Sequence, residues 1–200
     1  RVAHPVPRAR REERERFLGM LSSDARRMER LVTRLLHLAR AETVNPGEDT
    51  CDVPKVLASV VTRFLELGVN ITAAPFQIGE GACVVRMTDE TLDALLTNFL
   101  DNARQHGGPG VRVTLSVAAA LHNDAAAIRI DVIYNGPGIS PANLNRVFDA
   151  FFTTARENGW TGLGLAIVRA TAAAHGGKAT LSSAGEGQGT IASLILPRLV

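Results

Sequence analysis

Apolar residues recur every three or four positions between residues 10 and 42, with arginines between them. This spacing predicts one long amphipathic helix over residues 10–42. Because an exposed apolar stripe of this length needs a partner surface, we expect the rest of the chain or a second copy to cover it. The apolar positions are Phe17, Leu18, Leu21, Met28, Leu31, Val32, Leu35, Leu36 and Leu38.

The pattern changes after the helix-breaking run Asn45-Pro46-Gly47, where mixed periodicities replace the arginine-rich helix. We therefore expect a domain boundary near Pro46, between residues 1–46 and 47–200. Further helices are predicted at residues 53–67, 90–106, 143–152 and 162–175. Strands are predicted at residues 69–73, 83–87, 111–118, 126–133, 179–183 and 190–196, and a loop at 153–161. This order indicates an α+β fold, an α/β sandwich in which helices cover one face of a mixed sheet.

Charge and composition argue against several classes of function. The formal net charge is only +2, yet half of the Lys and Arg residues fall within the first 40 positions. Acidic residues such as Glu12 and Glu29 are interleaved with them, which favours a solvated helix face over a nucleic-acid site.

No apolar run approaches the roughly 20 residues of a membrane span, so we expect a cytoplasmic portion without membrane contact. An inner-membrane anchor in a full-length parent is compatible with that expectation. Cys51 and Cys83 lack metal-ligand spacing and are expected to be reduced and buried.

Candidate chemistry begins on the predicted helix at residues 90–106. Asn98 and Asn102 stand four positions apart, so their amides share one face, and His106 follows one turn later. Amides and an imidazole can ligate a hard cation or donate to phosphate oxygens. Taken alone, the same pattern also fits the polar surface of an ordinary amphipathic helix.

Two glycine-rich turns follow. Tyr134-Asn135-Gly136-Pro137-Gly138-Ile139 comes directly after a predicted strand, where glycines let a ligand approach the backbone. Gly162-Leu163-Gly164-Leu165 opens a predicted helix, whose free N–H groups and dipole suit an anionic phosphate. Each turn alone is a weak signal.

The order and spacing of these motifs resemble those of bacterial sensor histidine kinases, within the superfamily of gyrase, heat-shock protein 90, histidine kinases and MutL. Residues 98–103 resemble the asparagine box, and residues 135–139 resemble most of the first glycine box. Residues 146–154 are similar to the phenylalanine box that begins the ATP lid, and residues 161–168 to the second glycine box. Residues 27–32 and 38–40 are similar to the second dimerisation helix.

This resemblance implies a catalytic domain over residues 47–200 that binds ATP or another purine nucleotide with Mg²⁺. It also implies a homodimer through residues 10–42 and a response regulator receiver domain as partner. The phosphoacceptor histidine box has no match here, since His4 precedes a proline and His37 lies on the second helix; residues 1–46 are therefore expected to be a partial dimerisation domain. Asn102 is the implied Mg²⁺ ligand. The implied nucleotide-binding residues are Asn98, Asn102, Gln105, His106, Tyr134, Asn135, Gly136, Gly138, Ile139, Phe151, Trp160, Gly162, Leu163, Gly164, Leu165 and Thr190.

Three positions depart from the family pattern. Tyr134 stands where the family has an Asp that accepts a hydrogen bond from the adenine amino group. Trp160 replaces a glycine before the second glycine box, and Gln105 stands where a basic residue often assists the phosphates. An unpaired donor costs about 1–3 kcal/mol, which predicts adenine binding weaker by roughly one to two orders of magnitude.

Three functions therefore stay open. The first is a kinase that transfers the γ-phosphate to a histidine of the dimerisation domain. The second is a pseudokinase or a regulatory module with altered nucleotide specificity, suggested by Tyr134 and Trp160. The third is hydrolysis, which in gyrase-like relatives uses a Glu four positions before the metal-binding Asn. That position is Asn98 here, and Asp101 is expected on a different helix face from Asn102, so hydrolysis is least favoured.

Overall fold

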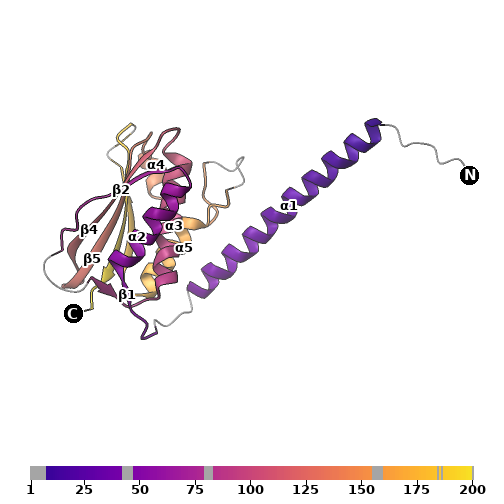
Figure 1. Cartoon of the computed structure of the whole chain (residues 1–200). Helices are drawn as coiled ribbons and strands as arrows, with labels where there is room; N and C mark the ends of the chain where they lie inside the picture. Colours follow the sequence, from indigo (N-terminus) through magenta and orange to yellow (C-terminus); the bar gives the residue numbers. More distant parts are fainter. Residues whose placement is uncertain are drawn as a thin grey trace, which may run out of the picture.

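A long helix and a two-layer body of helices and strands make up the chain (Figure 1). The computed structural model describes residues 8–41, 47–78, 83–154, 160–183, 185 and 187–199. The residues Asn45 and Pro46 of the expected boundary and most of the predicted loop at 153–161 lie outside these ranges. None of the described helices is long and apolar enough to cross a membrane.

The main sheet has the strand order β2-β4-β5-β7-β6. Strand β2 (Asn70–Ala73) pairs in parallel with β4 (Arg112–His122), whereas β5 (Ala125–Tyr134), β7 (Thr190–Pro197) and β6 (Lys178–Ser182) continue the sheet in antiparallel pairs. The β4–β5 turn consists of Asn123 and Asp124, whose φ angles are 50° and 61°. A two-residue turn of this kind matches the twist of the strands, so the pair extends further than predicted.

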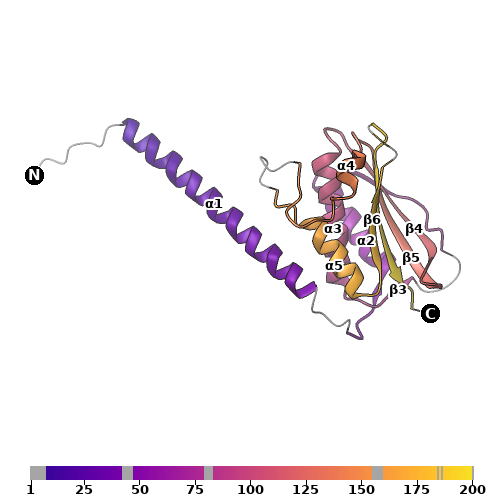
Figure 2. The same cartoon turned by 180° about the vertical axis from the view of Figure 1, so that it is seen from behind.

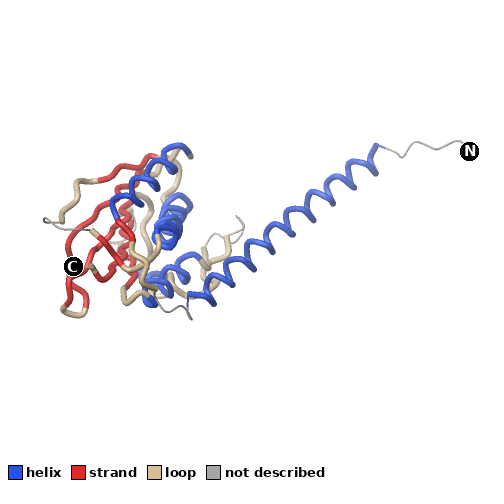
Figure 3. The backbone as a smooth tube through the Cα atoms, turned by 60° about the horizontal axis from the view of Figure 1, so that its bottom comes forward, coloured by secondary structure: helices blue, strands red, loops and turns tan. Residues whose placement is uncertain are grey.

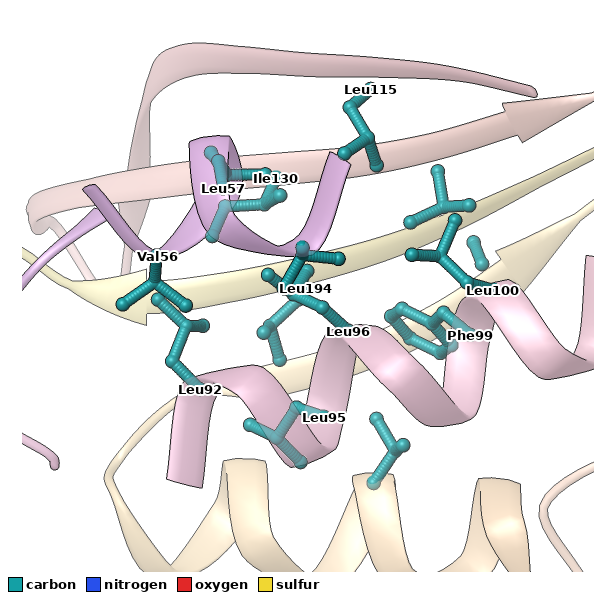
Figure 4. Close-up of a cluster of buried hydrophobic side chains, with 14 of the residues drawn as sticks. Val56, Leu57, Leu92, Leu95, Leu96, Phe99, Leu100, Leu115, Ile130 and Leu194 are labelled. Atoms are coloured by element: carbon teal, nitrogen blue, oxygen red, sulfur yellow. The ribbon is translucent and has the colours of Figure 1, made fainter. Parts of the chain in front are cut away.

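Three helices cover one face of this sheet, as the sequence predicted (Figures 2 and 3). They are α2 (Val53–Glu66), α3 (Asp89–His106) and α5 (Gly164–Ala174). Their apolar faces meet the inward side chains of the central strands in one core, which includes Leu57 of α2, Leu96 and Phe99 of α3 and Leu194 of β7 (Figure 4). All four side chains are at most 2% exposed. Burial of this continuous core fixes α3 against the sheet.

Some predicted elements are wrong in extent. The predicted helix at 143–152 is only one turn, α4 (Pro141–Leu144), and Phe151, near its predicted end, has a φ of +66° that a right-handed helix cannot contain. The helix predicted from residue 162 begins at Gly164, since Gly162 has a φ of +68°. The predicted strand at 83–87 shortens to β3 (Val84–Val85), which pairs with an unpredicted strand, β1 (Cys51–Asp52). Cys51 is buried as expected, but Cys83 is only partly buried.

The long helix α1 (Arg8–Ala41) closely matches the predicted range of 10–42. Its C-terminal part lies beside α5, and the rest extends away from the body (Figures 1 and 2). Much of its apolar stripe is exposed, including Phe17 at 61%, Met28 at 66% and Val32 at 56%. The body therefore covers only the end of the stripe, and coverage of the remainder by a second copy stays a prediction.

Candidate functional site

A cavity of about 690 Å³ opens between α3, the turn after β5 and the segment that leads into α5. It brings together twelve of the predicted site residues, from the helix that carries the two asparagines, from both glycine-rich segments and from β7. The predicted residues that line it are Asn98, Asn102, Gln105, His106, Tyr134, Gly138, Ile139, Trp160, Gly162, Gly164, Leu165 and Thr190.

Helix α3 supplies the amide side of the cavity. Its N-terminus is capped by Thr88, whose Oγ1 accepts a hydrogen bond from the Thr91 backbone N–H at 3.1 Å. The Asn98 Nδ2 donates to the Ala94 carbonyl oxygen at 2.8 Å, and the Asn102 Nδ2 donates to the Tyr134 Oη at 3.0 Å. Both nitrogens are thus used within the protein, and the amide oxygens are the atoms suited to a cation or a donor.

Tyr134, the last residue of β5, forms part of the cavity wall and is only 3% exposed. Burial raises the pKa of its phenol, while hydrogen bonds with Thr190 and Asn102 act in the opposite direction. The hydroxyl is therefore neutral at physiological pH. An uncharged group that is already bonded to Asn102 therefore forms this part of the cavity wall.

Two glycines bring the backbone close to the amides of α3. A Cβ on Gly164 would lie 2.8 Å from the Asn98 Oδ1, so the first turn of α5 can approach Asn98 only without a side chain. Gly162 adopts a positive φ, and a Cβ there would lie 2.6 Å from the Phe152 carbonyl oxygen. As a result, the first residues of the 11-residue helix α5, Gly164 and Leu165, line the cavity, and a helix N-terminus carries free N–H groups.

Gln105 contributes a donor that the protein itself does not satisfy. Its Nε2 atom is buried and has no hydrogen-bond partner among the described residues, and the side chain lines the cavity. An unpaired buried donor costs about 1–3 kcal/mol, so a ligand oxygen at this point would relieve that cost. Nearby, burial lowers the pKa of His106, which favours the neutral imidazole.

Four predicted residues do not line the cavity. The Asn135 Oδ1 accepts a hydrogen bond from the Arg112 backbone N–H at 2.6 Å, so this side chain holds the turn to β4. Gly136 packs against Gly107, where a Cβ would lie 2.9 Å from its Cα. Phe151 is 50% exposed, and Leu163 is fully buried beneath the loop. These residues therefore shape the cavity from behind or from its rim.

The cavity also contains residues that the sequence did not predict. Asp101, which the sequence predicted on a different helix face from Asn102, also lines it. Arg34 reaches it from α1, far away in the sequence. The asparagine box spans Asp101 and could have indicated it, whereas no local pattern marks Arg34. The others are Pro137, Ser140, Asn143, Val147, Phe152, Thr153, Thr154, Leu181 and Gly187.

Comparison with known proteins gives consistent matches. A family model described as "Histidine kinase-, DNA gyrase B-, and HSP90-like ATPase" matches residues 87–200. The signal transduction histidine-protein kinase AfsQ2 of Streptomyces coelicolor is 36% identical over 190 residues, covering 92% of this chain and 33% of AfsQ2. The probable sensor histidine kinase TcrY of Mycobacterium tuberculosis is 34% identical over 171 residues, covering 83% of this chain and 35% of TcrY.

The fold of a solved structure is also similar. The mycobacterial sensor histidine kinase MprB superposes with a TM-score of 0.62 at 26% identity, covering 76% of this chain and 97% of that structure. The chain spans about a third of the length of the two curated relatives named above.

Proposed function

Because this chain belongs to the family of histidine kinase-, DNA gyrase B- and HSP90-like ATPases and carries a histidine kinase catalytic domain, we propose that its cavity binds a magnesium–nucleotide complex and presents the γ-phosphate to a histidine. One observation carries the proposal. A single cavity combines the amides of α3, the N-terminus of α5 and the unpaired Gln105 Nε2. A polyphosphate offers acceptor oxygens to Gln105 and to the N-terminus of α5.

The donor set fits Mg²⁺ bound together with a nucleotide. No cluster of three or more His, Cys, Asp or Glu side chains that could hold a metal occurs in the described part of the chain. Mg²⁺ commonly retains waters and takes only one or two protein ligands beside phosphate oxygens, which the Asn102 Oδ1 can match. When bound, the cation would neutralise charge on the phosphates. The hydrogen bond from the Asn102 Nδ2 to Tyr134 turns the amide oxygen away from the phenol and so orients this ligand.

The contribution of this chain to phosphotransfer is then one of positioning. Gly162 and Gly164 let backbone N–H groups approach the phosphates, and Gln105 donates to one of their oxygens. The neutral His106 can donate or accept one hydrogen bond without repelling a cation. Hydrolysis is less favoured, because Asn98 occupies the place of the carboxylate that would activate water, and its amide nitrogen is held by Ala94.

The part of the cavity around Tyr134, called the base subsite below, supports a change in nucleotide preference within the same function. The Tyr134 hydroxyl lies inside the cavity wall, is neutral, and has already accepted a hydrogen bond from Asn102. It is therefore a poorer acceptor for the adenine amino group than a carboxylate. We expect discrimination between adenine and guanine to be weak. The named relatives are kinases and give no support to a non-catalytic module.

Partners follow from the same family assignment. We propose that the exposed stripe of α1 pairs with a second copy and that the phosphoryl group passes from the histidine to a response regulator receiver domain. The support is the exposure of Leu18, Leu21 and Leu36 along one helix. Sedimentation of the chain across a concentration series would detect such a dimer.

Calorimetric titration with ATP, ADP and GTP, each with and without Mg²⁺, tests the proposal. We expect micromolar, Mg²⁺-dependent binding of ATP and a GTP affinity within about tenfold of it, since Tyr134 supplies no charged acceptor. The absence of binding at millimolar nucleotide would overturn the proposed function.

A further inference from the structure

A cation from outside the catalytic fold reaches the cavity. Arg34 lies on α1, about two turns before the helix ends at Ala41. It is partly buried and lines the cavity, whereas its neighbours Leu35 and Leu36 are 42% and 52% exposed. The side chain thus leaves the exposed helix and enters the candidate nucleotide site.

Two contacts locate the guanidinium group of Arg34 inside this site. Its Nη1 donates to the Thr161 Oγ1 at 3.1 Å, and its Cζ lies 6.0 Å from the centroid of the Trp160 ring. Burial raises the pKa of Asp101, another residue that lines the cavity, while the charges of Arg104 and Arg34 act in the opposite direction. The guanidinium therefore lies between α3 and the residues that lead into α5.

The contact with Thr161 places the charge at the anion-binding end of α5. The Thr161 Oγ1 also accepts a hydrogen bond from the Leu163 backbone N–H at 3.4 Å, directly before the helix begins at Gly164. Backbone N–H groups at a helix N-terminus favour negative charge, and a guanidinium beside them strengthens that preference. Arg carries five N–H donors, of which the bond to Thr161 uses one.

Few charged side chains occur among the described residues that line the cavity. Arg34 is the only Lys or Arg among the described residues that line it, and Asp101 adds a carboxylate. Gln105, at the position where the family often has a basic residue, is uncharged. Among the lining residues that the structure describes, a nucleotide triphosphate would therefore meet no other positively charged side chain, even though its charge must be compensated.

We infer that Arg34 is a phosphate-binding residue, delivered to the catalytic cavity by α1, that replaces the charge missing at Gln105. The inference rests on the proposed nucleotide binding and adds that α1 completes the site. Bound nucleotide and docked α1 then stabilise one another, since each supplies a contact to the other. Release of the nucleotide weakens the hold of the body on α1.

The test is titration of the full 200-residue chain with AMP, ADP and the non-hydrolysable ATP analogue AMPPNP, in the presence of Mg²⁺. The variants are Arg34→Gln, Arg34→Lys and, as a matched control, Arg16→Gln, which removes the same charge from an exposed site on the same helix outside the cavity. Arg34→Gln is expected to weaken AMPPNP binding about 10- to 100-fold but AMP binding less than about threefold. Arg34→Lys should fall between the wild type and Arg34→Gln, because Lys keeps the charge but loses the planar fork.

Trp160 provides a second readout, since it is the only tryptophan in the chain and its ring lies beside Arg34. AMPPNP should change its fluorescence in the wild type and in Arg16→Gln, and much less in Arg34→Gln at the same fractional saturation. Equal losses of AMP and AMPPNP affinity in Arg34→Gln would indicate a purely structural latch and overturn the inference, as would no loss at all. Absence of nucleotide binding by the wild type would instead overturn the proposed function together with it.

Discussion

Replacing Tyr134 by Asp would place a charged hydrogen-bond acceptor in the base subsite. The change tests how the phenol of Tyr134 affects the choice of base. In the wild type, the Tyr134 Oη accepts from the Asn102 Nδ2 at 3.0 Å, and the residue is 3% exposed. The substitution removes a buried ring and introduces a carboxylate that faces the cavity. We expect it to increase nucleotide affinity and selectivity while decreasing stability.

The expected changes in nucleotide affinity and in stability have different physical sources. A hydrogen bond to a charged acceptor contributes about 1.5–3 kcal/mol, which corresponds to roughly 10- to 150-fold in the Kd for ATP. Guanine carries no amino group at the equivalent position, so the Kd for GTP should change little. Removal of the Tyr134 ring from the core should lower the free energy of unfolding by about 3–5 kcal/mol, as for other buried aromatic side chains.

Tyr134→Asn is the matched control, because it leaves nearly the same space but carries no charge. Calorimetric Kd values for ATP and GTP with Mg²⁺, together with urea unfolding curves, are compared for the wild type and both variants. The difference between the Asp and Asn variants isolates the carboxylate from the loss of the ring. If the two variants bind ATP equally well, or if GTP gains as much as ATP, the residue does not select the base and the reasoning is refuted.

Other changes test the remaining parts of the site. Asn102→Ala should abolish most of the Mg²⁺ dependence of nucleotide binding, measured by repeating the titration with and without the cation; an unchanged dependence would place the ligand elsewhere. Gly164→Ala should lower the free energy of unfolding by about 1–3 kcal/mol, because the new Cβ would lie 2.8 Å from the Asn98 Oδ1. Gly19→Ala, inside α1 and with no atom within 4 Å of its Cβ position, should stabilise α1 by up to about 1 kcal/mol. Urea unfolding measures both glycine variants, and the free energy of unfolding should fall in Gly164→Ala and rise in Gly19→Ala. Burial lowers the pKa of His106 below 6.5, so the unfolded chain takes up a proton first as the pH falls, and stability should decrease below about pH 6.5. His106→Gln should flatten this part of the pH–stability curve, and an unchanged slope would exclude His106 as its source.

Local patterns in the sequence predicted most of the helices and strands and many of the residues that line the cavity. Helical periodicity placed Asn98 and Asn102 on one face of α3, and the hydrogen bond from Asn98 to the Ala94 carbonyl oxygen is local to that helix. Glycines after β5 and before α5 marked the turns that approach the cavity. Such features depend on residues within a few positions of one another, so spacing alone predicts them.

Contacts between segments far apart in the sequence determine which residues complete the cavity. Arg34 donates to Thr161 across 127 positions of sequence, a contact that no local pattern encodes. The predicted helix at 143–152 failed for a similar reason, since the Phe151 backbone N–H donates to the Gly162 carbonyl oxygen at 3.0 Å and holds Phe151 at a positive φ. Periodicity describes the face that an element presents, whereas long-range packing decides what that face meets and where an element must end.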